Sequence, residues 1–273
     1  MHLENIKTLI NENYQTNDLF KRNIVKEYLQ ILILSFIYNH KIYKDLVFYG
    51  GSCLKHCYGL NRLSEDLDFV DLNKKIDLKK LAVDLAFFLE KQIDIKPIIK
   101  IQKFRIYLKL PLLKNLNLVD MRDSDLLFLK IEIFDQFNFC SKFKTQIIPI
   151  FKNNQSVLIK TFDLPTLMST KIRAVFNRQW EKTNKQGKTS IKVKGRDYYD
   201  LMWYLQKNIK PNLKCLPEVT NMEELKDKLL DKISKLDNQS IKLDLGALID
   251  DKNLIDNLSE NIKKILQEQI KNW

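Results

Sequence analysis

Asp66 and Asp68 stand one residue apart in the segment EDLDFV, and their spacing is suited to chemistry. Side chains alternate between the two faces of a β-strand, so a strand here points both carboxylates to the same side. Adjacent carboxylates repel each other unless a cation lies between them. Mg²⁺ suits this position because it prefers oxygen ligands and often combines one or two carboxylates with substrate phosphates. The pair therefore predicts a magnesium site for a phosphorylated substrate.

A glycine-rich turn precedes the two aspartates. Gly50, Gly51 and Gly59 are three of the six glycines in the chain. Where glycine is scarce, such a cluster indicates backbone that bends sharply or approaches a ligand closely. The pattern predicts a short strand at 47–49, a helical turn or two after Gly50-Gly51-Ser52, and a second strand with the aspartates. Each part alone is more often an ordinary turn or a solvated strand edge, but the combination favours a functional site.

The whole stretch from 47 to 71, VFYGGSCLKHCYGLNRLSEDLDFVD, resembles a known signature. A Gly-Ser pair followed by Asp-x-Asp is typical of the nucleotidyltransferase superfamily, which has a DNA polymerase β-like fold. With Arg62, Ser64 and Leu67 at the same spacing, the stretch is similar to the AbiEii/AbiGii family of bacterial nucleotidyltransferase toxins. Many members carry Thr in place of Ser52, and Ser keeps the hydroxyl.

The second half of the chain carries a further resemblance to the same family. PTLMSTKIRAVFNR, with Lys171, is followed by KGRDYYDLMWYL, with Arg196, Asp197 and Asp200. The resemblance implies that Lys171 contacts the nucleotide triphosphate, a task that suits its compact charge. It also implies that Asp197 belongs to the active site, where it helps to position or deprotonate the acceptor. The ordinary alternatives are an exposed helix face for Lys171 and Arg173, and a local ion pair or turn cap for Asp200.

The resemblance implies an enzyme that transfers a nucleoside monophosphate from an NTP to an acceptor and releases pyrophosphate. It implies two Mg²⁺ ions, one activating the acceptor hydroxyl and one bridging the triphosphate. Glycine lets the backbone approach the phosphates, and a hydroxyl at a helix N-terminus donates to them. The implied metal ligands are Asp66, Asp68 and Glu132. The implied catalytic residues are these three and Asp197. The implied nucleotide-binding residues are Gly51, Ser52, Arg62, Lys171 and Arg196.

In the superfamily a third carboxylate comes from a later strand beside the Asp-x-Asp strand. The segment LLFLKIEIFD at 126–135 alternates as a strand does, with Glu132 on its less apolar face. Glu132 is the best-placed candidate, while Asp120 and Asp135 are its rivals. A surface pair of Lys130 with Glu132 is the ordinary alternative, and the sequence leaves the choice open.

Composition indicates a globular chain with a basic surface. Its 273 residues are 45% hydrophobic and 29% charged, which is ordinary for a soluble protein. The net charge of +12 favours polyanionic partners, although a lysine-rich composition explains it equally well. The N-terminus lacks a signal-peptide pattern. The most apolar run, 31–38, is too short to span a bilayer. We therefore expect a cytoplasmic protein without membrane contact. We expect thiols rather than zinc ligands at Cys53, Cys57, Cys140 and Cys215.

We expect an α+β fold with two domains. Residues 1–160 are predicted to form a nucleotidyltransferase-like mixed sheet flanked by helices. Residues 161–273 are predicted to form a mostly helical domain that contributes nucleotide- and acceptor-binding residues. Asp18 and Asp163 are the expected N-caps of two helices, and Pro165 suits a first helical turn. The expected helices are 1–16, 19–40, 77–93, 164–180, 222–236 and 254–270. The expected strands are 47–49, the strand that carries Asp66 and Asp68, one or two strands within 98–110, and 126–135. A strand hairpin is also expected within 136–160.

The family implies a toxin of a toxin–antitoxin pair that modifies RNA, in particular tRNA, and that has a cognate antitoxin. The basic segment Lys182–Arg196 contains no acid and suits an RNA backbone as well as it suits a solvated connection. Nucleotide transfer to a small molecule, such as an aminoglycoside, or to a protein is the enzymatic alternative. A non-catalytic RNA-binding module is the third hypothesis, and the intact Asp66, Asp68 and Lys171 argue against it.

Overall fold

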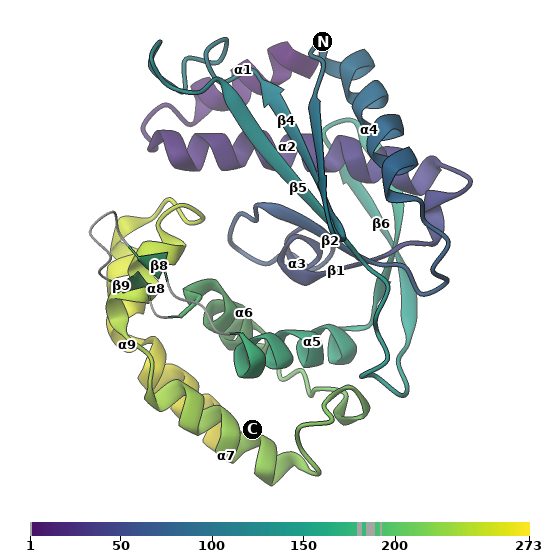
Figure 1. The fold of residues 1–273 in the computed structure, drawn as a ribbon. Coiled ribbons are helices and arrows are strands. Elements are labelled where there is room, and N and C mark those ends of the chain that lie inside the picture. Colours follow the sequence, from purple (N-terminus) through teal and green to yellow (C-terminus); the bar gives the residue numbers. More distant parts are fainter. Residues whose placement is uncertain (1, 179–181, 184–188, 192) are drawn as a thin grey trace. The chain divides into compact units, whose positions relative to one another are not determined.

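Figure 1 shows the computed structural model of the chain, which describes residues 2–178, 182–183, 189–191 and 193–273. The chain forms two compact units. Unit 1 comprises Met1–Phe137 and Thr145–Thr161, and unit 2 comprises Asn138–Lys144 and Phe162–Trp273. A mixed sheet dominates unit 1 and helices dominate unit 2, so the predicted α+β fold class is confirmed.

Unit 1 is built on a seven-stranded sheet whose order, in the described part of the chain, is β3-β4-β5-β2-β1-β7-β6. The β2–β5 and β1–β7 pairs are parallel, and the β1–β2, β3–β4 and β4–β5 pairs are antiparallel. The order makes β2 and β5 neighbours near the centre of the sheet. The strands are β1 (Val47–Tyr49), β2 (Asp66–Val70), β3 (Ile98–Gln102), β4 (Arg105–Pro111), β5 (Leu126–Phe134), β6 (Thr145–Lys152) and β7 (Gln155–Phe162).

Helices cover one face of this sheet because its side chains are apolar there. On β5, Leu127, Leu129 and Ile131 are buried, and each contributes about 1.5–3 kcal/mol through burial. The central residues of α2, Leu29–Leu34, are all buried, and α2 contacts β5 while α4 contacts β3 and β4. The described helices of unit 1 are α1 (His2–Glu12), α2 (Asp18–Asn39), the 3₁₀ helix η1 (Tyr43–Asp45), α3 (Gly50–Tyr58) and α4 (Leu78–Ile93).

Unit 2 is mainly a packed set of helices. Within it α6 contacts α5, α8 and α9, and α7 contacts α9. Asp163 caps α5 by accepting a hydrogen bond from the Thr166 N–H, as its position before a proline-containing first turn predicts. The elements described are α5 (Leu164–Asn177), β8 (Lys182–Thr183), β9 (Thr189–Ile191), α6 (Gly195–Gln206), the 3₁₀ helix η2 (Leu213–Cys215), α7 (Met222–Ser234), α8 (Asn238–Leu245) and α9 (Lys252–Lys271).

Some of the expected helix boundaries are wrong, and one helix was not predicted. Asn17 rather than Asp18 caps α2, because its side chain accepts from the Phe20 N–H and Asn is as good an N-cap as Asp. The helix expected to reach Trp180 ends at Asn177, and Trp180 itself lies outside the described residues. The segment after α7 forms a further helix, α8, which was not predicted because it is short and begins just after α7.

The expectation of four cysteine thiols is wrong for one pair. Cys140 and Cys215, which are 75 residues apart in sequence, form a disulfide within unit 2. Cys53 and Cys57 are free cysteines in α3. A pairing over such a distance has no local sequence signal, so spacing alone did not predict it. In the part of the chain that the structure describes, no helix combines the length and apolarity needed to cross a membrane.

Candidate active site

The pairing of β2 with β5 brings three carboxylates to one face of the sheet. Glu132 lies directly opposite Asp68 in the parallel register, and Lys130 lies opposite Asp66. Register partners share a face, so Asp66, Asp68 and Glu132 project to the same side. Asp120 lies in the segment between β4 and β5, and Asp135 follows the end of β5. Of the three candidates for the third carboxylate, Glu132 is therefore the one in register with the pair.

Two cations contact Asp66 and Glu132 within this carboxylate group. Lys130 Nζ lies 2.9 Å from Asp66 Oδ2 and 2.8 Å from Glu132 Oε1. Arg105 Nε, from the neighbouring strand β4, donates to Glu132 Oε1 at 2.9 Å. Burial alone would raise the pKa of Glu132, but Lys130 and Arg105 outweigh it and hold that pKa below its usual value. Burial alone would lower the pKa of Lys130, and the two carboxylates raise it instead.

The glycines at the start of α3 make room for the carboxylate site. Gly50 has φ +78°, and a Cβ atom there would overlap Asp68 Oδ2. A Cβ atom at Gly51 would lie 2.6 Å from Arg62 Nη2 and 3.2 Å from Ser64 Oγ. Only glycine tolerates both the left-handed backbone and these close approaches. The Gly-Gly pair therefore lets the N-terminus of α3 sit against Asp68 and Arg62.

The remaining residues of the motif fix the backbone around the site. The Ser52 hydroxyl is fully buried and donates to the carbonyl of Asp66, which ties α3 to β2. Arg62 is also buried, and its Nη1 donates to the carbonyl of Leu63 at 2.8 Å. Gln30 of α2 donates to the Ser64 carbonyl at 3.0 Å. The segment between α3 and β2 is thus held by side-chain bonds rather than by regular secondary structure.

The chemical type of the donor atoms at this site suits Mg²⁺. Three carboxylates on one face supply the hard oxygen ligands that Mg²⁺ prefers. The Lys130 ammonium lies between Asp66 and Glu132, where it supplies a positive charge to both. Among the described residues, no group of three or more His, Cys, Asp or Glu side chains is arranged to hold a metal ion as it stands.

Unit 2 holds the second group of predicted residues. Lys171 Nζ of α5 lies 2.8 Å from Asp197 Oδ1 and 2.7 Å from Asp200 Oδ2, which stand one turn apart on α6. Arg178, which the sequence did not single out, also pairs with Asp197. Burial alone would raise the pKa of Asp197, but Lys171 and Arg178 outweigh it and lower the pKa to about 2. These residues form an ion-pair cluster within unit 2 in which Asp197 and Asp200 are buried and Arg178 is exposed.

The K-G-R-D motif anchors the start of α6. A Cβ atom at Gly195 would lie 2.8 Å from the Cα atom of Ile241, so glycine allows α6 to pack closely on α8. The backbone N–H of Arg196 donates to Asp244 Oδ2 of α8 at 2.9 Å. This packing sets the position of Asp197 one residue later. The predicted basic segment Lys182–Arg196 includes 184–188 and 192, which lie outside the described residues.

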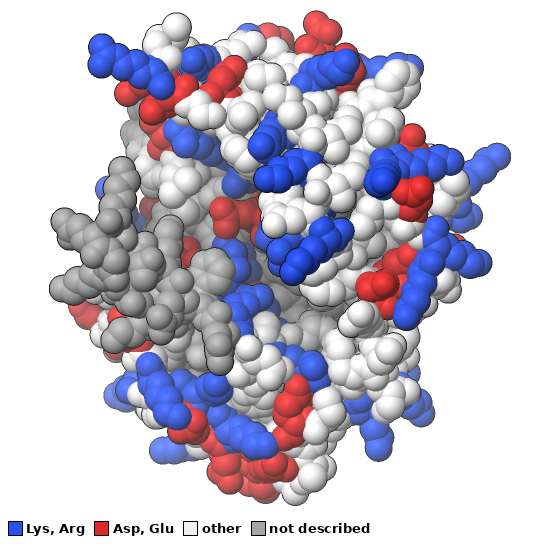
Figure 2. All heavy atoms as spheres, in the orientation of Figure 1, with Lys and Arg blue, Asp and Glu red and all other residues white. Residues whose placement is uncertain are grey.

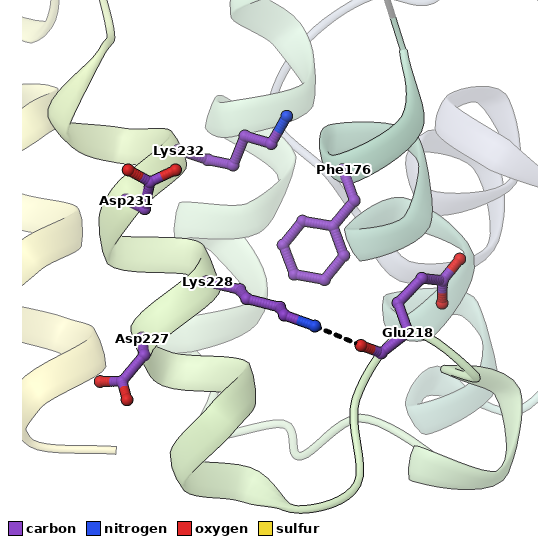
Figure 3. A pocket seen from close by; sticks show the side chains of 6 residues that line it. All are labelled: Phe176, Glu218, Asp227, Lys228, Asp231 and Lys232. Atoms are coloured by element: carbon purple, nitrogen blue, oxygen red, sulfur yellow. Dashed lines mark hydrogen bonds between the residues drawn. The ribbon is translucent and has the colours of Figure 1, made fainter.

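A pocket of about 420 Å³ also lies in unit 2, away from every predicted site residue. Figure 3 shows Phe176 of α5 on one side and side chains of α7 on the other. Lys228 Nζ donates to the Glu218 carbonyl at its edge. The residues that line it are Phe176, Glu218, Asp227, Lys228, Asp231 and Lys232. Its mixed charges and single aromatic ring do not resemble a triphosphate site.

The fold and the carboxylate arrangement define a class of protein. The Asp-x-Asp pair of β2 lies in register with Glu132 of β5 and next to the Gly-Gly-Ser start of α3, as the sequence resemblance to nucleotidyltransferases predicts. A profile of the family described as "Nucleotidyl transferase AbiEii toxin, Type IV TA system" matches residues 34–271. The chain therefore belongs to the AbiEii family of nucleotidyltransferase toxins, so it has a nucleotide substrate and an antitoxin counterpart.

Comparison with one solved structure supports the fold. The structure is similar to JHP933 from Helicobacter pylori, with a TM-score of 0.51, 20% identity, and coverage of 92% of this chain and 94% of that chain. It is also similar to a candidate nucleotidyltransferase from H. pylori, with a TM-score of 0.49, 19% identity, and coverage of 91% and 96%. No curated protein matches the chain.

Proposed function

We propose that this chain is a magnesium-dependent enzyme that transfers a nucleoside monophosphate from an NTP to RNA, with tRNA as the acceptor. The observation that carries the proposal is the register of β2 with β5, in which Glu132 stands beside Asp68 and Asp66. Membership of the AbiEii family supports nucleotidyl transfer. The net charge of +12 supports a polyanionic acceptor. Residues 1–160 act as the catalytic domain, and 161–273 contribute to nucleotide and acceptor binding.

Asp66, Asp68 and Glu132 would hold Mg²⁺. When bound, Mg²⁺ would polarise the triphosphate and lower the pKa of the acceptor hydroxyl. The N–H groups at the start of α3 donate to the phosphates, since a helix N-terminus attracts anions and the glycines leave the backbone bare. Because the Ser52 hydroxyl already bonds to the Asp66 carbonyl, its role is to hold β2, and its backbone N–H serves the phosphate.

In unit 2, Lys171 contacts the triphosphate and offsets the negative charge that develops there. Asp197 is a positioning residue that orients the Lys171 ammonium. With a pKa of about 2, Asp197 is a poor general base at neutral pH, so the deprotonating role does not suit it. Arg178 is a second cation on the same carboxylate and joins Arg62 and Arg196 among the residues proposed to favour nucleotide binding.

The test offers each of the four α-labelled NTPs, with Mg²⁺, to total bacterial tRNA. Wild type is compared with Asp66→Asn and with Asp45→Asn, which makes the same chemical change at an exposed position of η1. Label on tRNA should fall by at least about 100-fold in Asp66→Asn alone, because several kcal/mol of metal stabilisation are lost. Label on a protein or an aminoglycoside in place of RNA would overturn the RNA acceptor. Wild type that binds RNA but transfers no label would instead indicate a non-catalytic RNA-binding module.

A further inference from the structure

The two faces of the β3–β4–β5 part of the sheet are very different. On one face, Ile106, Leu108 and Leu110 of β4 are completely buried, and α4 packs against β3 and β4. On the other face, Ile98 of β3 is 54% exposed and Phe128 of β5 is 46% exposed. Exposed apolar side chains on an uncovered sheet face are typical of a binding surface. We call this surface the open face, and it consists of Ile98, Lys100, Arg105, Tyr107, Lys109 and Phe128.

The open face is basic and leads directly to the carboxylates. Lys100 of β3 is in register with Tyr107 of β4, which is in register with Lys130 of β5. Lys130 is in turn in register with Asp66 of β2, so one row of side chains crosses four strands. The stretch from 98 to 111, which forms β3 and β4, contains no acidic residue. In Figure 2, Lys and Arg side chains lie among uncharged residues over the region of β4 and β5.

Aromatic rings lie between the cations on this surface. The Phe128 ring is in register with Lys109, whose Nζ lies 5.3 Å from the ring centroid. Tyr107 is half-buried between Lys100 and Lys130. A base stacks on an aromatic ring whatever its identity, and neighbouring cations meet the phosphates that link the bases. A flat sheet face with rings and cations suits unstacked single-stranded RNA better than a duplex, whose bases are hidden.

We propose that the open face binds the single-stranded end of the RNA acceptor. Phosphates lie against Lys100 and Lys109, a base stacks on Phe128, and the strand runs along the sheet toward Asp66 on β2. This inference rests on the proposed transfer to RNA and names the surface that presents the acceptor. Adjacent strands are about 4.8 Å apart, so the row from β3 to β2 is about 14 Å long, enough for more than one nucleotide.

The test measures binding of a fluorescent single-stranded oligoribonucleotide of about 12 nucleotides by anisotropy at several salt concentrations. Lys100→Gln/Lys109→Gln should weaken binding about tenfold and lower the slope of log K against log salt by about 1.4, since two phosphate contacts are lost. Phe128→Ala should weaken binding about tenfold with the slope unchanged, since stacking carries no charge. The matched control is Lys79→Gln/Lys80→Gln, which removes two exposed charges from α4 and should bind as wild type does.

The outcomes separate this inference from the proposed function. Equal weakening in the control would mean that only net charge matters, and it would overturn the open face as the site. Unchanged binding in all variants, with label still transferred to RNA, would overturn the inference and leave the proposed function standing. Displacement of the oligonucleotide by poly-aspartate, with label found on protein instead of RNA, would assign the face to an acidic protein. Wild type that neither binds nor labels RNA would overturn both proposals.

Discussion

Lys130 lies at the centre of the carboxylate site, because its ammonium contacts both Asp66 and Glu132. If Lys130 is replaced by Met, the two carboxylates lose their shared counter-ion while the apolar stem is kept. Because Lys130 is 27% exposed, we expect the protein to lose only about 1–2 kcal/mol of unfolding free energy in EDTA. Mg²⁺ should restore part of the loss, since it replaces the missing positive charge.

Hydrogen exchange of β2 and β5, with and without Mg²⁺, measures this effect where it arises. Lys41→Met is the matched control, because Lys41 is exposed and lies outside the sheet. Unchanged protection in metal-free Lys130→Met would show that the ammonium does not hold the site together.

Asp197 makes the stability of unit 2 depend on pH. Its pKa of about 2 in the folded protein lies below the ordinary Asp value of 3.8. Because the pKa of Asp197 is lower in the folded than in the unfolded protein, its ionised carboxylate stabilises the fold. This contribution to the free energy of unfolding is about 2 kcal/mol. It is fully present above about pH 4 and is lost as the pH falls toward 2. Asp197→Asn should be less stable at neutral pH and should lack this part of the acid destabilisation.

The free energy of unfolding of unit 2 can be followed by tryptophan fluorescence in urea at different pH values. All three tryptophans, Trp180, Trp203 and Trp273, belong to unit 2. Asp250→Asn, at an exposed position after α8, is the control and should follow the wild-type pH dependence. An Asp197→Asn protein with the wild-type loss of stability between pH 4 and 2 would refute the assignment.

Local spacing predicted some features of the candidate site and missed others. Asp66 and Asp68 share a face because strands alternate, and the sequence was enough to state that. Arg105 was not predicted as a site residue, because its contact with Glu132 depends on the pairing of β4 with β5. Arg178 was missed because it follows the end of α5 and meets Asp197 only through tertiary packing.

The junction of β1 with α3 sets the geometry of the candidate site. Gly50 and Gly59 both have positive φ angles, +78° and +74°, but only at Gly50 would a Cβ atom meet Asp68. Gly59→Ala should therefore cost about 1–2 kcal/mol of stability through backbone strain and keep the transfer activity. Gly50→Ala should suffer the same strain and also displace Asp68, so its activity should fall at least about tenfold.

A thermal melt and a transfer assay on the two alanine variants make the comparison. The prediction fails if Gly50→Ala and Gly59→Ala lose the same activity, since strain alone would then explain both.

Among the elements, those with strong periodicity were predicted best. The alternation of β5 and the spacing of α4 were clear because each buries one face, and Asp77 caps α4 by accepting from two backbone N–H groups. The predicted N-cap of α2 was wrong because Asn17 and Asp18 are both suitable caps. Residue propensity alone does not distinguish between neighbouring cap positions.

At the scale of the whole molecule, the fold class was predictable but the strand order was not. Motifs and alternation indicated a mixed sheet followed by helices, and the structure confirms this. The parallel pairing of β2 with β5 joins segments that are far apart in the chain, and the same is true of the Cys140–Cys215 disulfide. Neither has a local signal, since both follow from packing. The pairing of β2 with β5 places Glu132 beside Asp68, and Glu132 is for that reason the proposed third carboxylate.

The rate of nucleotide transfer to RNA by Glu132→Gln, measured beside Asp120→Asn and Asp135→Asn, tests whether Glu132 is the third metal ligand. Each variant replaces a carboxylate with its amide, so the three differ only in position. The transfer rate of Glu132→Gln should fall by at least about 100-fold because a metal ligand is lost. The other two should stay within about twofold of wild type, as surface substitutions do. Full activity in Glu132→Gln, with activity lost in Asp120→Asn or Asp135→Asn, would contradict this assignment.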